Sequence, residues 1–356
     1  MPAHPWYRVP DHPPGCPETV DTAPRRNYAL YVHKLPIGIL GASGYAGREL
    51  TALALRHPSL ELAFAAANAR AGERVRVAGR EITFESADAA RLGDAALVFS
   101  ALPHGASAKY VAAARAAGAK VVDLSADLRP GSGHPADLAL GDVPYGLTEV
   151  ARDAVRAADV VANPGCYPTA TLLGLLPLLE RDLVAPGATI SVSAASGVTG
   201  AGNTPRGDLM FAEVAEDFRA YSAGNGHRHV AEMQSVVQRY GADADLVFTP
   251  HLLPVARGIL ATIVVPVREP VANPLQLWRE RYANEPFVEI ADEAPTLRDV
   301  VHRNVVRITA MPAQNVRRPA VIILAAIDNL VKGAAGQAMQ NANLQLGLDE
   351  AMGLPS

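Results

Sequence analysis

Cys166 carries the most reactive chemistry that this 356-residue chain offers. It stands in the segment 163–168 (NPGCYP), between a short apolar run at 159–162 and an apolar helical pattern at 169–180. We therefore expect the thiol close to the start of a helix, where the helix dipole favours the thiolate and raises its nucleophilicity. A lone cysteine can also serve as a small buried apolar residue, so position alone leaves both interpretations open.

A candidate base for this thiol lies downstream in the segment 226–229 (GHRH), before a helix expected over 230–240. An imidazole that approaches a thiol in space can carry its proton. His229 could equally be a solvated surface histidine or bind substrate. The H-x-H pair could also suggest a metal, but no second Cys/His/Asp/Glu cluster at ligand spacing accompanies it, so we expect no metal site.

The glycine-rich segment 41–47 (GASGYAG) follows an expected strand at 36–40 and opens an expected helix at 47–56. In this context glycines let the backbone approach a pyrophosphate, and the helix N-terminus offers unpaired N–H groups. The spacing is G-x-x-G-x-x-G rather than G-x-G-x-x-G, and such a turn can also form without a ligand. The predicted contacts of a dinucleotide are Gly41, Ser43, Gly44, Tyr45, Ala46 and Gly47.

The end of the second expected strand, 60–67, bears on the choice of dinucleotide. NAD enzymes usually carry an acidic residue there for the ribose 2′-hydroxyl. This chain has Asn68, Ala69 and Arg70 instead, which favours the 2′-phosphate of NADP. Arg70 could alternatively be an ordinary solvated arginine.

The remaining patterns predict an α/β protein with two domains. Expected strands at 36–40, 60–67, 95–101 and 120–124 alternate with helical stretches, including one at 111–117, as in a parallel sheet of βαβ units. Beyond residue 166, β-branched runs at 189–194, 246–249, 259–267, 305–309 and 320–327 suggest a mixed, largely antiparallel sheet. We therefore predict a Rossmann-type dinucleotide-binding domain at 36–165, completed by a C-terminal helix at 329–350, and an α+β catalytic and oligomerisation domain at 166–328. Residues 1–35 are expected to form a poorly ordered extension.

Composition narrows the range of partners. A formal net charge of −4 leaves no basic excess for a nucleic acid or an anionic membrane, and no apolar run is long enough for a membrane span. Neither Cys16 nor Cys166 has a nearby companion, and two isolated thiols make neither a disulfide framework nor a metal site. We expect a cytoplasmic protein with a small-molecule partner.

Eight motifs in one order resemble the N-acetyl-gamma-glutamyl-phosphate reductases of arginine biosynthesis, within the wider aspartate-semialdehyde-dehydrogenase group. The resemblance covers residues 36–350. The motifs are GASGYAG (41–47), ALPHG (101–105), DLSADLR (123–129), NPGCYPTA (163–170), SGVTGAG (196–202), HRHVAE (227–232), HLLPVARGI (251–259) and NLVKGAAGQA (329–338).

The resemblance implies reduction of an acyl phosphate by NADPH through a thioester. It makes Cys166 the nucleophile and His227 the acid/base, and it implies a homodimer or homotetramer. Substrate contacts would come from Arg129, Ser196, His229 and Arg257, and further cofactor contacts from Pro103, His104, Gly105, Ser125 and Asn329.

Two positions depart from the family pattern, and two alternatives stay open. Ala231 stands where the family usually has proline, and Asn203 where it often has arginine, which affects the substrate contacts more than the nucleophile. A related reductase of lysine biosynthesis takes a carrier-protein-linked aminoadipate phosphate with one more methylene, a difference that an apolar pocket discriminates by only about 1–3 kcal/mol. A non-enzymatic NADP-binding sensor is the other alternative; it predicts an unreactive Cys166.

Overall fold

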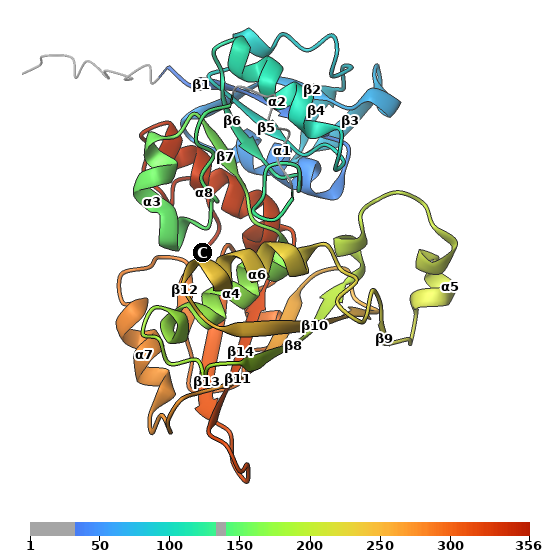
Figure 1. Cartoon of the computed structure of the whole chain (residues 1–356). Coiled ribbons are helices and arrows are strands. Elements are labelled where there is room, and N and C mark those ends of the chain that lie inside the picture. The colour runs from blue at the N-terminus through green and yellow to red at the C-terminus, as the bar shows by residue number, and fades with distance from the viewer. Residues whose placement is uncertain (1–32, 133–139) are drawn as a thin grey trace, which may run out of the picture. The chain divides into compact units, whose positions relative to one another are not determined.

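The computed structural model describes residues 33–132 and 140–356, of which Lys34–Ser356 form one compact unit. Within this unit a five-stranded parallel sheet and a seven-stranded mixed sheet organise the chain (Figure 1). The extension predicted at 1–35, including Cys16, lies almost entirely outside the described residues. None of the described helices is long and apolar enough to cross a membrane.

The parallel sheet has the strand order β2-β1-β5-β6-β7. Its strands are short and mostly apolar on both faces, as expected where helices cover a sheet on two sides. The parallel sheet predicted from the alternating pattern is confirmed. The strands are β1 (Leu35–Leu40), β2 (Leu60–Ala66), β5 (Leu97–Ser100), β6 (Lys120–Asp123) and β7 (Val160–Ala162).

Four helices pack with this sheet: α1 (Tyr45–Arg56), α2 (Ser107–Ala116), α3 (Thr148–Ala157) and α8 (Gly336–Gln345). The last of these comes from the far end of the chain, and Figure 1 shows it beside α3. Ala338 and Met339 of α8 share one apolar core with Ile37 and Ile39 of β1 and Leu50 of α1. The C-terminal helix is therefore part of the core under the parallel sheet.

The mixed sheet has the order β12-β13-β14-β11-β8-β10-β9, with four antiparallel and two parallel neighbours. Alternate residues of its long strands are buried on one face and half-exposed on the other, the pattern of a sheet with one covered face. The predicted mixed, largely antiparallel sheet is confirmed. Its strands are β8 (Ala188–Gly197), β9 (Arg219–Ala220), β10 (Ala244–Leu253), β11 (Ile259–Pro266), β12 (Val288–Ile290), β13 (Val306–Pro312) and β14 (Ala320–Ile327).

Helix α4 (Cys166–Leu179) is the central support of the covered face, with every residue after Cys166 buried. It packs with α6 (His229–Arg239) and α7 (Pro274–Arg281). Pro177 lies inside α4 and cannot donate a hydrogen bond to the carbonyl of Leu173. The hydroxyl of Tyr282, just after α7, donates to that carbonyl at 2.6 Å, so the gap left by the proline is closed.

Several elements were not predicted from the sequence. They include α3, α7, the hairpin β3 (Arg74–Val77) and β4 (Arg80–Thr83), strands β9 and β12, the short helix α5 (Phe211–Val214) and the 3₁₀ turns η1 (Asn68–Arg70), η2 (Leu92–Asp94), η3 (Val198–Ala201), η4 (Gly207–Leu209) and η5 (Leu297–Asp299). The expected helix at 329–350 begins instead as a π-helical turn, η6 (Val331–Ala335), in which the N–H of Ala335 bonds to the carbonyl of Leu330. Such turns occur frequently at functional sites.

Candidate active site

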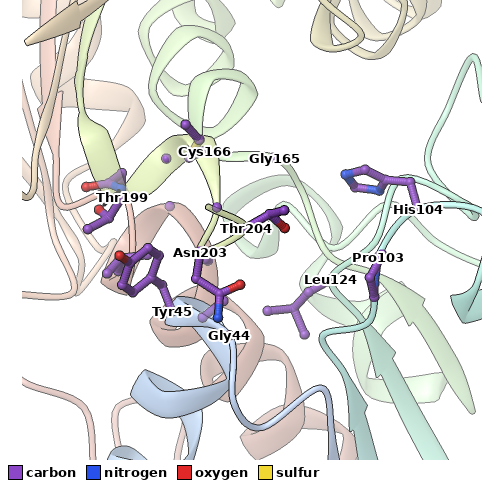
Figure 2. Close-up of a pocket in the computed structure, with 18 of the residues that line it drawn as sticks. Gly44, Tyr45, Pro103, His104, Leu124, Gly165, Cys166, Thr199, Asn203 and Thr204 are labelled. Atoms are coloured by element: carbon purple, nitrogen blue, oxygen red, sulfur yellow. Dashed lines mark hydrogen bonds between the residues drawn. The ribbon is translucent and has the colours of Figure 1, made fainter. Parts of the chain in front are cut away.

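A cavity of about 940 Å³ runs from the glycine loop to Cys166 (Figure 2). Its wall is built from segments that are distant in sequence: the loops after β1 and β5, the start of α4, the loop between β8 and β9, the start of α6 and the turn after β14. A second cavity of about 560 Å³ lies on the other side of the α6 N-terminus and shares His104, Arg129, Arg228 and His229 with the first.

The glycine loop fits a phosphate group because two of its glycines close the turn and the third leaves open space at the helix N-terminus. Gly41 has a φ of +79°, and a Cβ there would meet the carbonyl oxygen of Ala101 at 2.3 Å. A Cβ on Gly47 would meet the carbonyl of Gly41 at 2.2 Å, so these two positions close the turn. Gly44 caps α1 and has nothing nearer than 3.5 Å, which leaves room above the helix N-terminus.

Cys166 is the first residue of α4, as the sequence predicts, and its side chain is half-buried in the cavity wall. Burial raises the pKa of the Cys166 thiol above its ordinary value, although Arg129 and the backbone N–H of Tyr167 act in the opposite direction. The helix start does favour the thiolate, since the N–H of Tyr167 lowers the pKa of the thiol, but desolvation outweighs this effect and the net pKa is raised. A base is needed to remove the thiol proton.

The turn η6 approaches the nucleophile from the other side. A Cβ on Gly333 would meet Cβ of Cys166 at 2.8 Å, so only glycine fits there. Asn329, just before this turn, is buried and lines the cavity. Its side chain accepts a hydrogen bond from the N–H of Gly258 at 2.8 Å and donates one to the hydroxyl of Thr199 at 2.9 Å.

His227 lies in an aromatic enclosure in the cavity wall, 5.6 Å from the ring of Tyr167 and 4.6 Å from that of His229 between centroids. Its Nδ1 accepts a hydrogen bond from the backbone N–H of His229 at 3.2 Å, so the ring proton is on Nε2. Burial, with Arg228 nearby, lowers the pKa of His227 to about 4. The ring is therefore neutral at pH 7.

His229 is more deeply buried and lacks one hydrogen-bond partner. Its Nε2 lies 3.4 Å from Nη1 of Arg129, which can only donate, so Nε2 is the acceptor and the proton is on Nδ1. That Nδ1 has no hydrogen-bond partner among the described residues. Burial and the cations Arg129 and Arg228 hold the pKa of His229 well below its usual range. His229 lines both cavities, and its Nδ1–H is a buried donor without a partner among the described residues.

Glu232, which we did not predict, connects the loop before Cys166 with Arg129 and helix α6. Its carboxylate accepts hydrogen bonds from the N–H of Gly165 at 2.9 Å and the hydroxyl of Tyr145 at 2.7 Å, and pairs with Arg129 at 3.3 Å. Because Gly165 precedes the nucleophile and Glu232 is on the helix that begins with His229, this carboxylate fixes the two helix starts relative to each other. Two sequence signals could have identified Glu232: its place in the motif HRHVAE and its helical spacing from His229.

Four residues predicted to bind ligands do not line either cavity. Arg257 pairs with Glu49 and Asp328, and Arg70 pairs with Glu73 at 2.7 Å. Both arginines are held by carboxylates of the protein itself. The other two are serines whose hydroxyls donate within the protein: Ser125 to Asp123 at 2.7 Å and Ser196 to the carbonyl of Gly197 at 3.0 Å.

The other predicted positions do meet at the cavities, although their roles remain predictions. Gly105 lines only the smaller cavity. Asn203, which replaces the family's usual arginine, lines the larger cavity and donates to the carbonyl of Ser43 at 3.2 Å. Predicted residues that line the larger cavity are Gly41, Ser43, Gly44, Tyr45, Ala46, Gly47, Pro103, His104, Arg129, Cys166, His227, His229 and Asn329.

Comparison with known proteins identifies the family. A protein of Cellvibrio japonicus named N-acetyl-gamma-glutamyl-phosphate reductase is 42% identical over 341 residues, covering 89% of this chain and 97% of its own length. A protein of the same name from Pseudomonas aeruginosa is 40% identical over 340 residues, covering 90% and 98%. The chain belongs to the N-acetyl-gamma-glutamyl-phosphate reductase family.

Two family models agree with this assignment, and a solved structure shares the fold. The model for the semialdehyde dehydrogenase NAD binding domain matches residues 36–158, and that for the semialdehyde dehydrogenase dimerisation domain matches residues 166–329. Aspartate semialdehyde dehydrogenase II of Vibrio cholerae superposes with a TM-score of 0.71 at 20% identity, covering 88% of this chain and 99% of that one. The predicted family and fold class are confirmed: this oxidoreductase family member has a Rossmann-type dinucleotide-binding part and a mixed-sheet part that matches a dimerisation domain.

Proposed function

We propose that the chain reduces N-acetyl-L-glutamyl 5-phosphate with NADPH to N-acetyl-L-glutamate 5-semialdehyde and phosphate, a step of arginine biosynthesis. The observation that carries this proposal is the single cavity that joins Cys166, at the start of α4, to the glycine loop at the start of α1. A nucleophile and a dinucleotide cradle that share one cavity suit a reaction in which a covalent acyl group is reduced.

The residues around the glycine loop fit NADPH. The open space above Gly44 at the N-terminus of α1 accommodates a pyrophosphate, and Pro103, His104 and Asn329 line the path toward Cys166. No carboxylate stands directly after β2, where Ala67 and Asn68 follow, which favours a 2′-phosphate over a 2′-hydroxyl. When bound, NADPH supplies the hydride.

The chain's own residues supply the covalent and proton chemistry. The sulfur of Cys166 attacks the acyl carbon, the bond from carbon to the phosphate oxygen breaks, and phosphate leaves with the electron pair and, finally, the thiol proton. His227, neutral at pH 7, takes that proton and passes it to the phosphate. Accepting it at Nδ1 requires the hydrogen bond from the His229 amide to open. After reduction of the thioester, the tetrahedral oxyanion expels the thiolate of Cys166 to give the aldehyde, and a proton from solvent restores the thiol.

The uncovered face of the mixed sheet supports a homodimer. Leu260 and Val264 of β11 and Ile322 and Leu324 of β14 point to this face and are only half-buried. Apolar side chains in such an array are typical of subunit contacts. We expect a dimer, or a tetramer built from dimers, when molar mass is measured by light scattering, and a cytoplasmic location for the enzyme.

The reverse reaction tests the proposed function directly. Purified protein is mixed with NADP, inorganic phosphate and N-acetylglutamate semialdehyde, and NADPH absorbance is followed beside a Cys166→Ser variant. The proposal requires NADPH formation by the wild type and none by the variant; a silent wild type would support the non-enzymatic sensor instead. Adding the aminoadipate-derived semialdehyde as a competitor tests the lysine-pathway alternative, which requires a higher kcat/KM for the longer substrate.

A further inference from the structure

The arginines around the larger cavity differ in how their charge is neutralised. Four line it among the described residues: Arg129, Arg206, Arg219 and Arg228. Arg206 pairs with Asp208 at 2.6 Å, Arg219 with Asp217 at 2.6 Å and Arg129 with Glu232 at 3.3 Å. Within residues 33–132 and 140–356, Arg228 has no such carboxylate partner.

Arg129 in particular is fully occupied by the protein. Its Nε donates to the carbonyl of Asn163 at 2.8 Å, its Nη2 donates to the carbonyl of Leu124 at 2.6 Å, and its Nη1 faces His229 and Glu232. The side chain is 5% exposed. A guanidinium held by its own loop after β6, by the loop before Cys166 and by α6 acts as a positioning residue and has little capacity left for a ligand.

Arg228, in contrast to Arg129, is not paired with a carboxylate among the described residues. It is the N-cap residue of α6, lies between His227 and His229, and lines both cavities. It is close enough to Cys166 to act on the sulfur, since its charge lowers the pKa of the Cys166 thiol against the larger effect of burial. Arg228 is exposed to solvent, and partial desolvation together with the neighbouring Arg129 lowers its pKa, so an anion bound here would offset the positive charge of the two arginines.

Two further features at the same place favour an anion. The buried Nδ1–H of His229 has no partner among the described residues, and His229 is only 3% exposed. The positive end of the eleven-residue helix α6 starts at the same point. An oxyanion beside Arg228 would therefore meet a guanidinium, an unpaired N–H and a helix N-terminus together.

We propose that Arg228, with the Nδ1–H of His229, binds the phosphoryl group of the acyl phosphate and then the departing phosphate. This inference rests on the proposed function and assigns the phosphate contact to a residue other than Arg129 and Arg257. During attack by Cys166, the carbon–oxygen bond to phosphate breaks and a further negative charge develops on that phosphate oxygen. A planar fork of N–H donors matches two phosphate oxygens and stabilises this charge.

The test compares Michaelis constants in the reverse direction. Replacing Arg228 by alanine should raise KM for inorganic phosphate about 10- to 100-fold, the loss expected for charge-assisted hydrogen bonds, and leave KM for the semialdehyde and for NADP little changed. Arg228→Lys, which keeps the charge but not the fork, should fall between. The matched control is Arg239→Ala on the last turn of the same helix, far from the cavity, which should leave all three constants unchanged.

Each alternative source of negative charge gives a different result. A rise in KM for the semialdehyde alone would overturn the inference in favour of the substrate carboxylate, and a rise in KM for NADP alone in favour of the cofactor. An unchanged KM for phosphate in an active Arg228→Ala enzyme would also overturn it. Thermal melting of each variant shows whether it is folded. If Arg228→Ala is unfolded, the KM for phosphate of Arg228→Lys still decides the test.

A second measurement needs no turnover and so separates this inference from the proposed function. Inorganic phosphate should slow alkylation of Cys166 by iodoacetamide, followed by mass spectrometry of the peptide that contains it. The half-protecting phosphate concentration should rise about 10- to 100-fold in Arg228→Ala and stay unchanged in Arg239→Ala. If phosphate protects the wild type but the wild type shows no turnover, the proposed function alone is contradicted. If phosphate protects the wild type and Arg228→Ala equally well, the inference about Arg228 alone is contradicted.

Discussion

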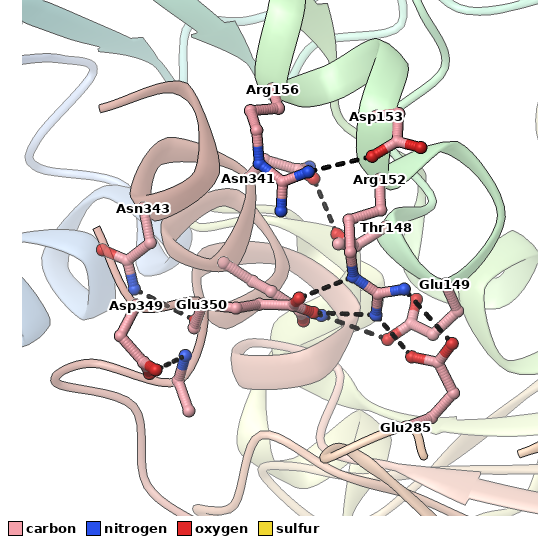
Figure 3. Close-up of polar contacts among 12 residues, drawn as sticks. Thr148, Glu149, Arg152, Asp153, Arg156, Glu285, Asn341, Asn343, Asp349 and Glu350 are labelled. Atoms are coloured by element: carbon pink, nitrogen blue, oxygen red, sulfur yellow. Dashed lines mark hydrogen bonds and ion pairs between the residues drawn. The ribbon is translucent and has the colours of Figure 1, made fainter. Parts of the chain in front are cut away.

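Two clusters of polar and charged side chains, one buried beside α8 and one lining the cavity at Cys166, are built in opposite ways. In the first, Lys332 of η6 is fully buried and donates to Glu149 of α3 at 2.6 Å and to Gln340 of α8 at 2.8 Å. Figure 3 shows Glu149 beside Arg152, which pairs with Glu285 and Glu350. In the second, around Cys166, His227 and His229 are neutral and Arg228 has no carboxylate partner in the part of the chain that the structure describes.

The difference shows what each cluster does. Burial alone would raise the pKa of Glu149, but Lys332 and the hydrogen bonds lower it overall, so the carboxylate stays charged and holds α3, η6 and α8 together. Such a cluster needs no ligand. Around Cys166, Nδ1 of His229 has no hydrogen-bond partner and Arg228 has no carboxylate partner among the described residues, so a bound substrate can supply both. Variants in the first cluster should therefore change stability, and variants in the second should change turnover.

The largest expected effect is a loss of activity, and it should come from the cluster around Cys166. Replacing His227 with asparagine should lower kcat about 10²- to 10⁴-fold, since it removes the proton carrier, with little change in the free energy of unfolding. His302→Asn is the matched control: His302 is exposed, lies outside the cavities and has a φ of +69°, which asparagine accepts. A kcat unchanged by loss of His227 would assign proton transfer to another group.

The next effect concerns stability. Glu149→Gln leaves Lys332 charged and buried without a counter-ion, so the free energy of unfolding measured in urea should fall by about 3–5 kcal/mol. Breaking the exposed pair of Arg268 and Asp182 with Arg268→Ala should cost about 0–1 kcal/mol. Adding Lys332→Met to Glu149→Gln should restore part of the loss. Equal effects of the buried and exposed substitutions would contradict the structural role given to the first cluster.

A smaller effect should appear as pH falls. The pKa of His227 and of His104 is lowered to about 4, and that of His229 is lowered well below 6.5, so the unfolded chain binds these protons first. Stability should therefore be complete above pH 6.5 and decline as pH falls from there toward 4. His229→Gln should make this decline shallower, whereas His302→Asn should not. A urea midpoint that is constant from pH 7 to 5 would show that these histidines are not held neutral.

Local patterns predicted the features that depend on neighbouring residues. The turn at Gly41 and Gly47, the position of Cys166 at a helix start and the alternation of β11 and β14 all follow from residue type and short spacing, and all are present. The pattern predicted the helix-start effect on Cys166 but not the larger, opposite effect of burial on its pKa, because burial depends on chain segments that the pattern does not contain.

Pairing between distant side chains could not be predicted in this way. Arg70 and Arg257 have the charge for a phosphate or carboxylate, but Glu73, Glu49 and Asp328 already neutralise them. Conversely, nothing in the sequence around Arg228 indicates that it lacks a partner. The state of an arginine depends on which carboxylate the fold brings to it, and that information is tertiary.

Mass spectrometry of the covalent intermediate tests the central claim most directly. The protein is incubated with N-acetyl-L-glutamyl 5-phosphate without NADPH, and the peptide that contains Cys166 is then analysed. The account predicts an N-acetylglutamyl adduct on Cys166 that disappears when NADPH is added and is absent from Cys166→Ser. Full turnover by a wild type that never forms this adduct, or an equally active Cys166→Ser variant, would contradict it.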